Sequence, residues 1–197
     1  MDNLPAIQKL ALTKFERTDL PSYLTPDEIQ AMLETCKDNR RNHAFLNILW
    51  QTGARVSEAL KVTRNDIDSY GLTIKILTEK QRNKRSKPVF RIIPISPELS
   101  NELASYILHY NITDRLFAFS RQRAWQIIRQ TAERAGLSSK NIHPHVFRHS
   151  FAIHCLRSGM PLPVLQKVLG HSSILVTMIY LRVVQPDIQE FMRKVQF

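Results

Sequence analysis

Glycine and cysteine are both scarce in this sequence, which holds 5 glycines and 2 cysteines among 197 residues. There is no internal repeat and no low-complexity tract, and a hydrophobic content of 43% is that of a packed, largely helical protein rather than a disordered one. Cys36 and Cys155 lie too far apart in sequence to indicate a disulfide framework or a zinc knuckle, so we expect reduced thiols. The length suits one well-buried domain and is too short for two full-sized ones.

Long apolar runs are absent as well. No run approaches the roughly 18 residues that are needed to span a bilayer. The opening MDNLPAIQKL also lacks the charged-then-apolar layout of a secretion signal. We therefore expect a cytoplasmic protein with no membrane-spanning segment.

Acidic residues are few beside the basic ones. The chain has 17 Asp and Glu against 28 Lys and Arg, which gives a formal charge of +11 and a pI of about 10.0. A polyanion is therefore the natural partner. Nucleic acid and an anionic membrane surface both fit the charge alone.

Helix signals cover most of the chain. Thr25-Pro26-Asp27-Glu28 forms a capping box, with Thr25 as the N-cap and Pro26 at the first helical position, so a helix should begin there. Ser120 and Gly136 mark the start and the end of a later helix. Further helices are expected over residues 41–51, 55–61, 97–109, 121–135, 145–158, 161–169, about 174–180 and 186–195.

Two segments rich in isoleucine, valine and threonine, 72–78 and 89–95, predict a pair of antiparallel strands. The predicted fold class is therefore mainly α with a small antiparallel β-sheet. The stretch between the strands is the most basic in the protein, and it predicts either a solvated hairpin or one that follows a DNA backbone. The candidate DNA-binding residues are Arg82, Lys84, Arg85 and Lys87 in this stretch and Arg121 and Arg123 near the start of the 121–135 helix.

The segment from His145 to Tyr180, together with Arg55, carries the groups that attack a phosphodiester. A phenol with a pKa near about 10 is a poor nucleophile at neutral pH, so Tyr180 needs cationic neighbours and a base. Arg55 and Arg148 suit paired phosphate clamps, because a guanidinium donates two parallel hydrogen bonds and stays charged. His145 and His171 can flank the same phosphate, one assisting proton removal and the other bonding an oxygen, and the sequence leaves open which does which.

The 5′ oxygen that leaves in such a cleavage needs a proton. A lysine between the two predicted strands is the expected donor, and the sequence offers Lys80, Lys84 and Lys87. Together these groups indicate cleavage of a DNA strand by a tyrosine.

Two other interpretations compete for the same region. The first is a metal cluster, formed by the histidines His143, His145, His149 and His154. No carboxylate or cysteine completes a four-ligand set, and Arg148 would repel a cation, so we expect no metal and no cofactor. His149 and His154 are then expected to pack or hydrogen-bond in the core. The second interpretation makes Tyr180 a half-buried packing residue, the commoner fate of a tyrosine behind apolar neighbours.

The stretches HPHVFRHSFAIHCLRSG, LQKVLGHSS and TMIYLRV, with LTPDEIQAML and QTGARVSEALKVTRNDID upstream, together resemble the catalytic domain of the tyrosine recombinase family. This family includes phage integrases, chromosome-dimer resolvases and fimbrial inversion recombinases. The resemblance implies the fold of that domain, linkage of the tyrosine to the 3′ phosphate, release of a 5′ hydroxyl, and rejoining without metal, ATP or ligase. The active site that it implies consists of Arg55, Lys80, His145, Arg148, His171 and Tyr180.

The resemblance also implies partners. We expect double-stranded DNA with a specific recombination site and a homotetramer on that DNA, joined through a C-terminal helix at about 186–195. Accessory DNA-bending proteins are a further partner class, and a nucleoid-associated location follows from DNA binding. Integration, excision, inversion and resolution all stay open.

Members of this family usually carry a separate helical DNA-binding domain, the core-binding domain, before the catalytic one. Only residues 1–20 precede the matched region here, so we expect a linker or N-terminal arm over 1–20, a catalytic domain over 21–197, and no separate core-binding domain. The chain is then either a short recombinase resembling the fimbrial inversion enzymes or a truncated product. Two rival interpretations are a non-cleaving DNA-binding or regulatory relative that depends on a partner recombinase, and a relaxing enzyme of the type IB topoisomerase kind.

Overall fold

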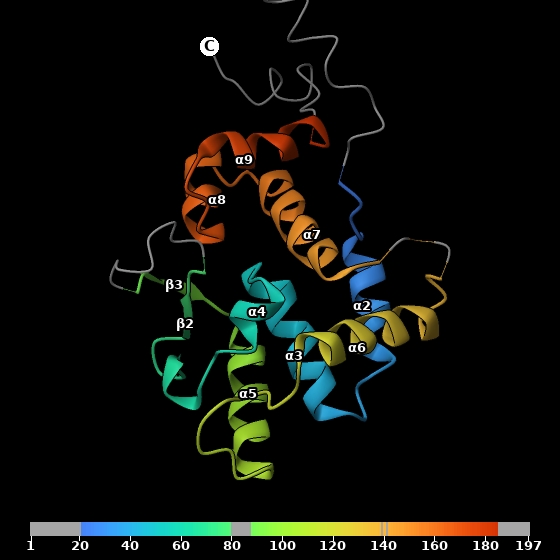
Figure 1. Ribbon diagram of the computed structural model, residues 1–197, viewed down its shortest axis with the longest axis vertical. Helices are drawn as coiled ribbons and strands as arrows, with labels where there is room; N and C mark the ends of the chain where they lie inside the picture. Colours follow the sequence, from blue (N-terminus) through green and yellow to red (C-terminus); the bar gives the residue numbers. More distant parts are fainter. Residues whose placement is uncertain (1–20, 80–87, 139, 141, 185–197) are drawn as a thin grey trace, which may run out of the picture.

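The computed structural model describes residues 21–79, 88–138, 140 and 142–184 (Figure 1). Most of this part of the chain is helical, and a three-stranded antiparallel sheet lies at one side, so the predicted fold class is confirmed. Several predictions lie outside the described residues. They concern the arm 1–20, the C-terminal helix 186–195, and Lys80, Arg82, Lys84, Arg85 and Lys87.

Each helix that the sequence predicts within the described residues is present, with ends within two residues of the predicted ones. The capping box is also confirmed: Glu28 N–H donates to Thr25 Oγ1 at 3.3 Å, and Thr25 N–H donates to Glu28 Oε2 at 2.9 Å. The elements are α2 Pro26–Glu34, α3 Arg40–Thr52, α4 Val56–Ala59, α5 Pro97–His109, α6 Arg121–Arg134, α7 Pro144–Arg157, α8 Leu162–Leu169 and α9 Ile174–Met178, with 3₁₀ turns η2 Arg64–Asp66 and η3 Ile179–Arg182.

The sheet has the order β1-β2-β3, with strands β1 Ile67–Asp68, β2 Thr73–Leu77 and β3 Phe90–Pro94. Ile74 of β2 pairs with Ile67 on one side and with Ile93 on the other. The predicted antiparallel pair is therefore confirmed. Strand β1 was not predicted, because two residues are too short to show an alternating pattern.

The buried hydrophobic side chains form two clusters that meet along α7. The larger cluster is built from α2 to α6, the inner face of the sheet and the start of α7 with Val146 and Phe147. The smaller cluster contains the second half of α7, the inner face of α8, and Tyr180. Figure 1 shows α7 running from the larger part of the molecule to the end formed by α8 and α9. Helix α7 thus contributes to both clusters.

A glycine at the end of α3 allows the two clusters to approach closely. Gly53 adopts φ 60°, and a Cβ at this position would lie 2.4 Å from Phe151 Cδ1 and 3.0 Å from Leu169 Cδ2. We expect Gly53→Ala to lower the free energy of unfolding by well over the roughly 1–2 kcal/mol that the left-handed conformation costs an alanine. Gly136→Ala is the matched control, since Gly136 has φ 75° and nothing within 4 Å of a Cβ. Urea unfolding of both variants checks this, and equal losses would contradict the steric argument.

Cys36 and Cys155 are both buried and free, as the sequence predicts. Burial raises the pKa of each thiol to about 11. Within the described ranges no single helix has the length and apolarity to cross a membrane, although α8 and the α9–η3 segment meet the criteria as a pair bent by 109°.

Candidate active site

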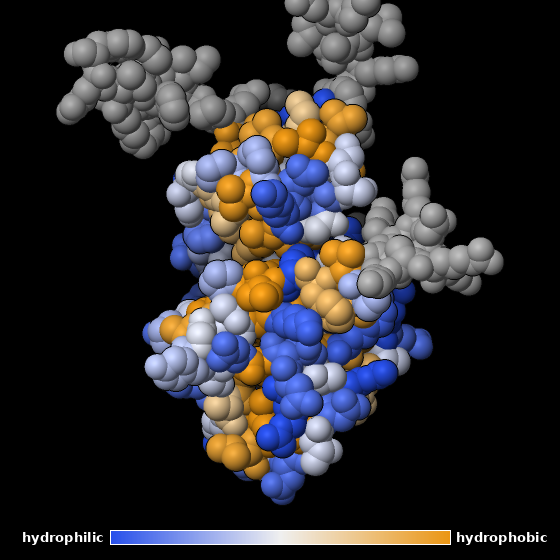
Figure 2. Space-filling view, turned by 90° about the vertical axis from the view of Figure 1, so that its left-hand side faces the viewer, coloured by the Kyte–Doolittle hydropathy of each residue, from blue (hydrophilic) through white to orange (hydrophobic). Residues whose placement is uncertain are grey.

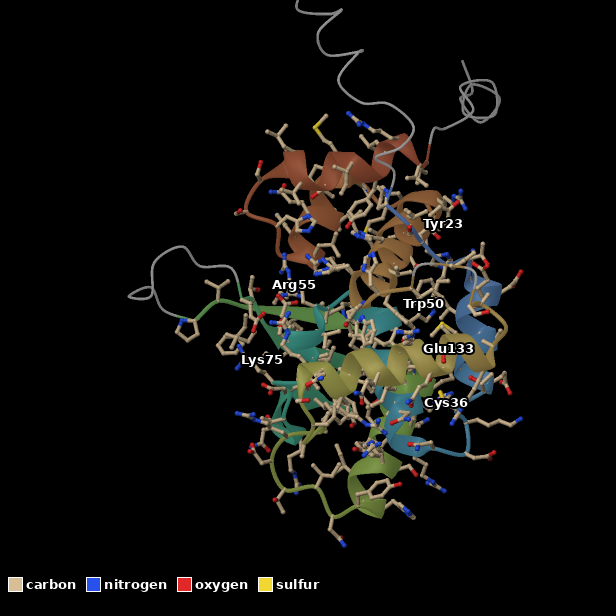
Figure 3. The ribbon with its side chains drawn as sticks, turned by 45° about the vertical axis from the view of Figure 1, so that its right-hand side comes forward. Tyr23, Cys36, Trp50, Arg55, Lys75 and Glu133 are labelled. Atoms are coloured by element: carbon tan, nitrogen blue, oxygen red, sulfur yellow. The ribbon has the colours of Figure 1, made fainter. Side chains whose placement is uncertain are left out.

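The turn between α3 and α4, residues 53–55, forms the first corner of the site. Gly53 ends α3, and Arg55 follows as the N-cap residue of α4. The Arg55 backbone N–H donates to Glu58 Oε2 and its Nη1 donates to Glu58 Oε1, both at 2.9 Å. Figure 3 shows Arg55 in the middle of the molecule, between the sheet and the end formed by α8 and α9. The corner therefore holds both the backbone and the guanidinium of Arg55.

Glu58 is a carboxylate with no exposed surface that contacts three guanidiniums. In addition to its bonds with Arg55, it accepts a hydrogen bond from Arg91 Nη2 of β3 at 2.6 Å and lies 3.9 Å from Arg148 Nη1. Arg91 Nη1 also donates to Thr78 Oγ1 at 3.0 Å. One carboxylate among three guanidiniums leaves a cluster of net positive charge, which suits an anion such as a phosphate.

Several causes act on the pKa of Glu58. Burial alone raises the pKa, but the hydrogen bond and charge of Arg91, the backbone N–H of Arg55 and the charge of Arg148 outweigh it. The pKa of this carboxyl therefore lies below its usual range, and Glu58 is ionised at neutral pH.

Arg148 connects this corner with a second one at the end of α8. Its side chain is 3% exposed, Nη1 donates to the Gly53 carbonyl at 2.8 Å, and Nη2 donates to the Leu169 carbonyl at 2.6 Å. Gly170 then ends α8 in the left-handed conformation, and His171 follows. Burial is the main cause that lowers the pKa of Arg148 to about 10, so it is cationic at neutral pH. One side chain thus ties together the two corners that carry Arg55 and His171.

The two predicted imidazoles lie on different elements. His145 is exposed on the first turn of α7, and partial burial of its ring, followed by the charges of His143 and Arg148, lowers its pKa. His171 lies in the loop between Gly170 and α9, which begins at Ile174 as predicted, and its Nδ1 is 2.8 Å from Thr177 Oγ1.

Tyr180 lies on η3 and is 2% exposed, so it is buried more deeply than the alternative interpretation of a half-buried packing residue expected. Its hydroxyl is 3.0 Å from His149 Nδ1. Burial raises the pKa of this phenol, and the charges of Arg148 and Arg55 oppose the rise. Burial and then the charge of His145 lower the pKa of His149 to about 4, so its imidazole is neutral at pH 7. His149 is hydrogen-bonded, as predicted, but its partner is the predicted nucleophile.

The remaining histidines do not form the metal cluster that the sequence raised as an alternative. The rings of His143, His145 and His149 lie 6.2–6.3 Å apart, centroid to centroid. Over the described ranges, no three metal-ligating side chains are arranged to hold an ion. His154 is exposed and packs on Trp50 at 5.2 Å, so its predicted core position is wrong, because this face of α7 turns outward.

The two predicted DNA-binding arginines of α6 are exposed at its first turn, which Ser120 caps. The charge of Arg121 acts on His145, so this end of α6 borders the site. Arg123 points to Gln126, whose Oε1 accepts from its Nη1 at 3.1 Å. Arg121 also lines a shallow groove with Ser57, Leu60, Lys61, Glu79, Arg115, Phe117, Ala118, Phe119 and Ser120.

The structure thus brings four of the six predicted site residues within electrostatic range, because the charges of Arg55 and Arg148 act on both His145 and Tyr180. His171 lies one residue beyond the corner that Arg148 binds, and Lys80 is outside the described residues. Sequence reasoning missed three neighbours of the site, Glu58, Arg91 and His149. The spacing from Arg55 to Glu58 is that of a capping box, which was a usable signal for Glu58. His149 is four residues from His145, which puts both on one face of a helix.

The chain belongs to the phage integrase family, whose family model matches residues 22–185. The predicted family resemblance is therefore confirmed.

Tyrosine recombinase XerD of Mycobacterium tuberculosis (strain CDC 1551 / Oshkosh) is 33% identical over 183 residues, which cover 82% of this chain and 56% of that protein. The crystal structure of XerA recombinase matches with a TM-score of 0.75 and 28% identity, covering 90% of this chain and 67% of that one. The catalytic domain of bacteriophage HP1 integrase matches with a TM-score of 0.66 and 28% identity, covering 88% of this chain and 94% of that one. The chain therefore spans only a little over half of the mycobacterial relative.

Proposed function

We propose that this protein is a site-specific DNA recombinase, which cleaves and rejoins strands through a covalent 3′-phosphotyrosine. The observation that carries the proposal is a cluster of one carboxylate and three guanidiniums, with the Tyr180 phenol within the electrostatic influence of two of them, Arg55 and Arg148. The family of the chain supports it, and so does the match along 94% of an integrase catalytic domain. Residues 21–197 are proposed to form a catalytic domain of the same kind.

Arg55 and Arg148 are proposed to bind the non-bridging oxygens of the scissile phosphate. A guanidinium has five N–H donors. The recorded bonds of Arg148 to carbonyl oxygens use two of these, which fixes the plane of the group and leaves three donors for a phosphate. A clamp that is held still before the reaction stabilises developing charge without reorganisation.

The remaining roles follow from the chemistry of strand cleavage. Tyr180 attacks phosphorus, and His145 and His171 flank the phosphate. The leaving 5′ oxygen takes its proton from a hairpin lysine, with Lys80 as the first candidate and Lys84 and Lys87 as alternatives. No metal ion and no cofactor has a role in this scheme.

Binding to a double-stranded recombination site is proposed to use the basic hairpin residues Arg82, Lys84, Arg85 and Lys87, together with Arg121 and Arg123. We also propose a tetramer on DNA, joined through the helix at 186–195. An apolar surface supports this assembly, because large hydrophobic side chains of α9 and η3 are exposed, and Figure 2 shows such side chains gathered at this end of the molecule. They are Ile174, Leu175, Val176, Met178, Ile179 and Leu181.

The test is adduct formation in the presence of a chelator. The protein is incubated with a library of nicked duplexes that carry a randomised central segment, and protein–DNA adducts are isolated on denaturing gels and sequenced. We expect an adduct on a defined set of sequences, formed equally well in EDTA. Salt-dependent binding with no adduct on any duplex would identify a non-cleaving relative instead, and relaxation of supercoiled DNA without a preferred site would identify a topoisomerase.

A further inference from the structure

The nucleophile proposed above has one recorded hydrogen-bond partner among the described residues, and it is not one of the two histidines that the sequence predicts. Tyr180 Oη lies 3.0 Å from His149 Nδ1, and the two ring centroids are 5.7 Å apart. Tyr180 is removed from bulk water, since it is 2% exposed, and His149 is partly buried. A phenol in such a position needs an unprotonated base close to its own oxygen to take up its proton.

The two predicted imidazoles occupy other places in the site. His171 Nδ1 lies 2.8 Å from Thr177 Oγ1. His149 is the histidine that the structure shows within hydrogen-bond distance of the phenol, and the His145 ring lies 6.2 Å from the His149 ring. His145 and His149 are one helical turn apart on α7, which leaves His145 free to face a phosphate while His149 faces the tyrosine.

We propose that His149 is the catalytic residue that accepts the proton of Tyr180 during strand cleavage, an inference that rests on the proposed recombinase function. The imidazole, protonated at Nε2, accepts the phenolic hydrogen bond at Nδ1. As the bond from Tyr180 Oη to phosphorus forms, the O–H proton passes to Nδ1 and the bond from phosphorus to the 5′ oxygen breaks. The 5′ oxygen is protonated by the general acid of the reaction. In rejoining, the same proton returns from His149 to the departing phenol.

The charged and titratable groups around His149 agree with this role. They are Tyr180 from η3, His145 and Arg148 from α7, and His143 at its N-cap. Burial and these positive charges lower the pKa of His149 to about 4, which keeps the imidazole neutral and able to accept a proton at pH 7. A phosphodiester bound by Arg148 adds a negative charge at the same place, and this raises the basicity of His149 when the substrate is bound.

The test separates proton transfer from simple positioning. In His149→Asn the amide oxygen still accepts a hydrogen bond near the place of Nδ1, but it does not take up a proton. We expect adduct formation on a duplex isolated from the randomised library to slow by about 100-fold or more at neutral pH. The rate of the variant should rise by about tenfold per pH unit under alkaline conditions, as the phenol ionises unaided, whereas the wild-type rate is nearly flat over the same range. Added imidazole should restore part of the rate of His149→Ala.

His154→Asn is the matched control, because His154 is on the same helix but exposed, with its ring packed on Trp50. It should form the adduct within about twofold of the wild-type rate. Thermal unfolding and DNA affinity of all variants establish that they are folded.

Each other result has a definite meaning. A His149→Asn variant with the wild-type rate and pH profile overturns the inference. So does a His149→Ala variant that forms the adduct faster than the wild type, because His149 would then restrain Tyr180 in an inactive position. A slow variant that neither alkaline pH nor imidazole restores makes His149 an orienting group only. In all three cases the wild-type adduct and its loss in Tyr180→Phe leave the proposed function in place. A wild-type protein that forms no adduct on any duplex overturns both proposals.

Discussion

Replacing Tyr180 with phenylalanine is expected to abolish the covalent adduct while DNA affinity stays within about twofold of the wild type, because affinity comes from the cationic groups that contact phosphates. The substitution removes one oxygen, which is both the proposed nucleophile and the partner of His149. The ring remains in the smaller hydrophobic cluster. Loss of the hydrogen bond should lower the free energy of unfolding by about 1 kcal/mol. Adduct gels and fluorescence anisotropy on one captured duplex measure the two quantities.

Tyr106→Phe is the matched control for this experiment. Tyr106 is also buried, and its hydroxyl donates to the Leu116 carbonyl at 2.8 Å in the larger cluster, remote from the site. It should lose a similar amount of stability and keep the adduct. Adduct formation by Tyr180→Phe would mean that another residue is the nucleophile. If both variants lost the adduct, the loss would be explained by lower stability and not by removal of the nucleophile.

Glu58→Gln is expected to have the largest effect on folding. The substitution keeps the shape of the side chain but leaves Arg91 and Arg148, which are 8% and 3% exposed, without their buried counter-charge. Breaking a buried ion pair in this way costs about 3–5 kcal/mol. Arg55 also loses the carboxylate that holds its guanidinium, so adduct formation should fall by about 100-fold or more, the loss typical of one misplaced electrostatic group. Urea unfolding and adduct rates at a temperature where the variant is folded measure both.

The pH dependence of this stability difference has a definite sign. The folded-state pKa of Glu58 is lowered, so its contribution is complete above the pKa of the unfolded carboxyl and disappears as the pH falls through the folded value. The gap between wild type and Glu58→Gln should therefore be full at neutral pH and narrow in acid. Glu133→Gln removes an exposed partner of Arg129 and should cost at most about 1 kcal/mol. Equal costs for the two variants would contradict the buried-network argument.

Much of this fold could be predicted from the sequence because its signals are local. The capping box at Thr25, the N-cap at Ser120 and the isoleucine-rich strands each lie within a few residues of the element they specify. The same holds for Arg148 and Tyr180, whose chemistry could be inferred from residue type and order along the chain. The corner residues Gly53 and Gly170 also end their helices in the left-handed conformation that glycine favours.

The rest of the site could not be predicted because it depends on contacts between distant segments. Arg91 is 33 residues from Glu58, and nothing in the basic stretch of the sequence distinguishes it from its neighbours. His149 is 31 residues from Tyr180, and its pairing follows from the way η3 packs on α7. The exposure of His154 and the burial of Tyr180 depend likewise on which side of α7 the second cluster covers. The hairpin lysines stay a prediction.

The bonds of Arg148 have a consequence for the biosynthesis of the protein. They join the carbonyl of Gly53, 95 residues earlier in the chain, to that of Leu169, 21 residues later. While α8 is still inside the ribosome, Arg148 Nη2 lacks its acceptor, the Leu169 carbonyl. Tyr180, the proposed nucleophile, is synthesised later still. A partial translation product or a proteolytic fragment that ends before this point therefore cannot assemble the site.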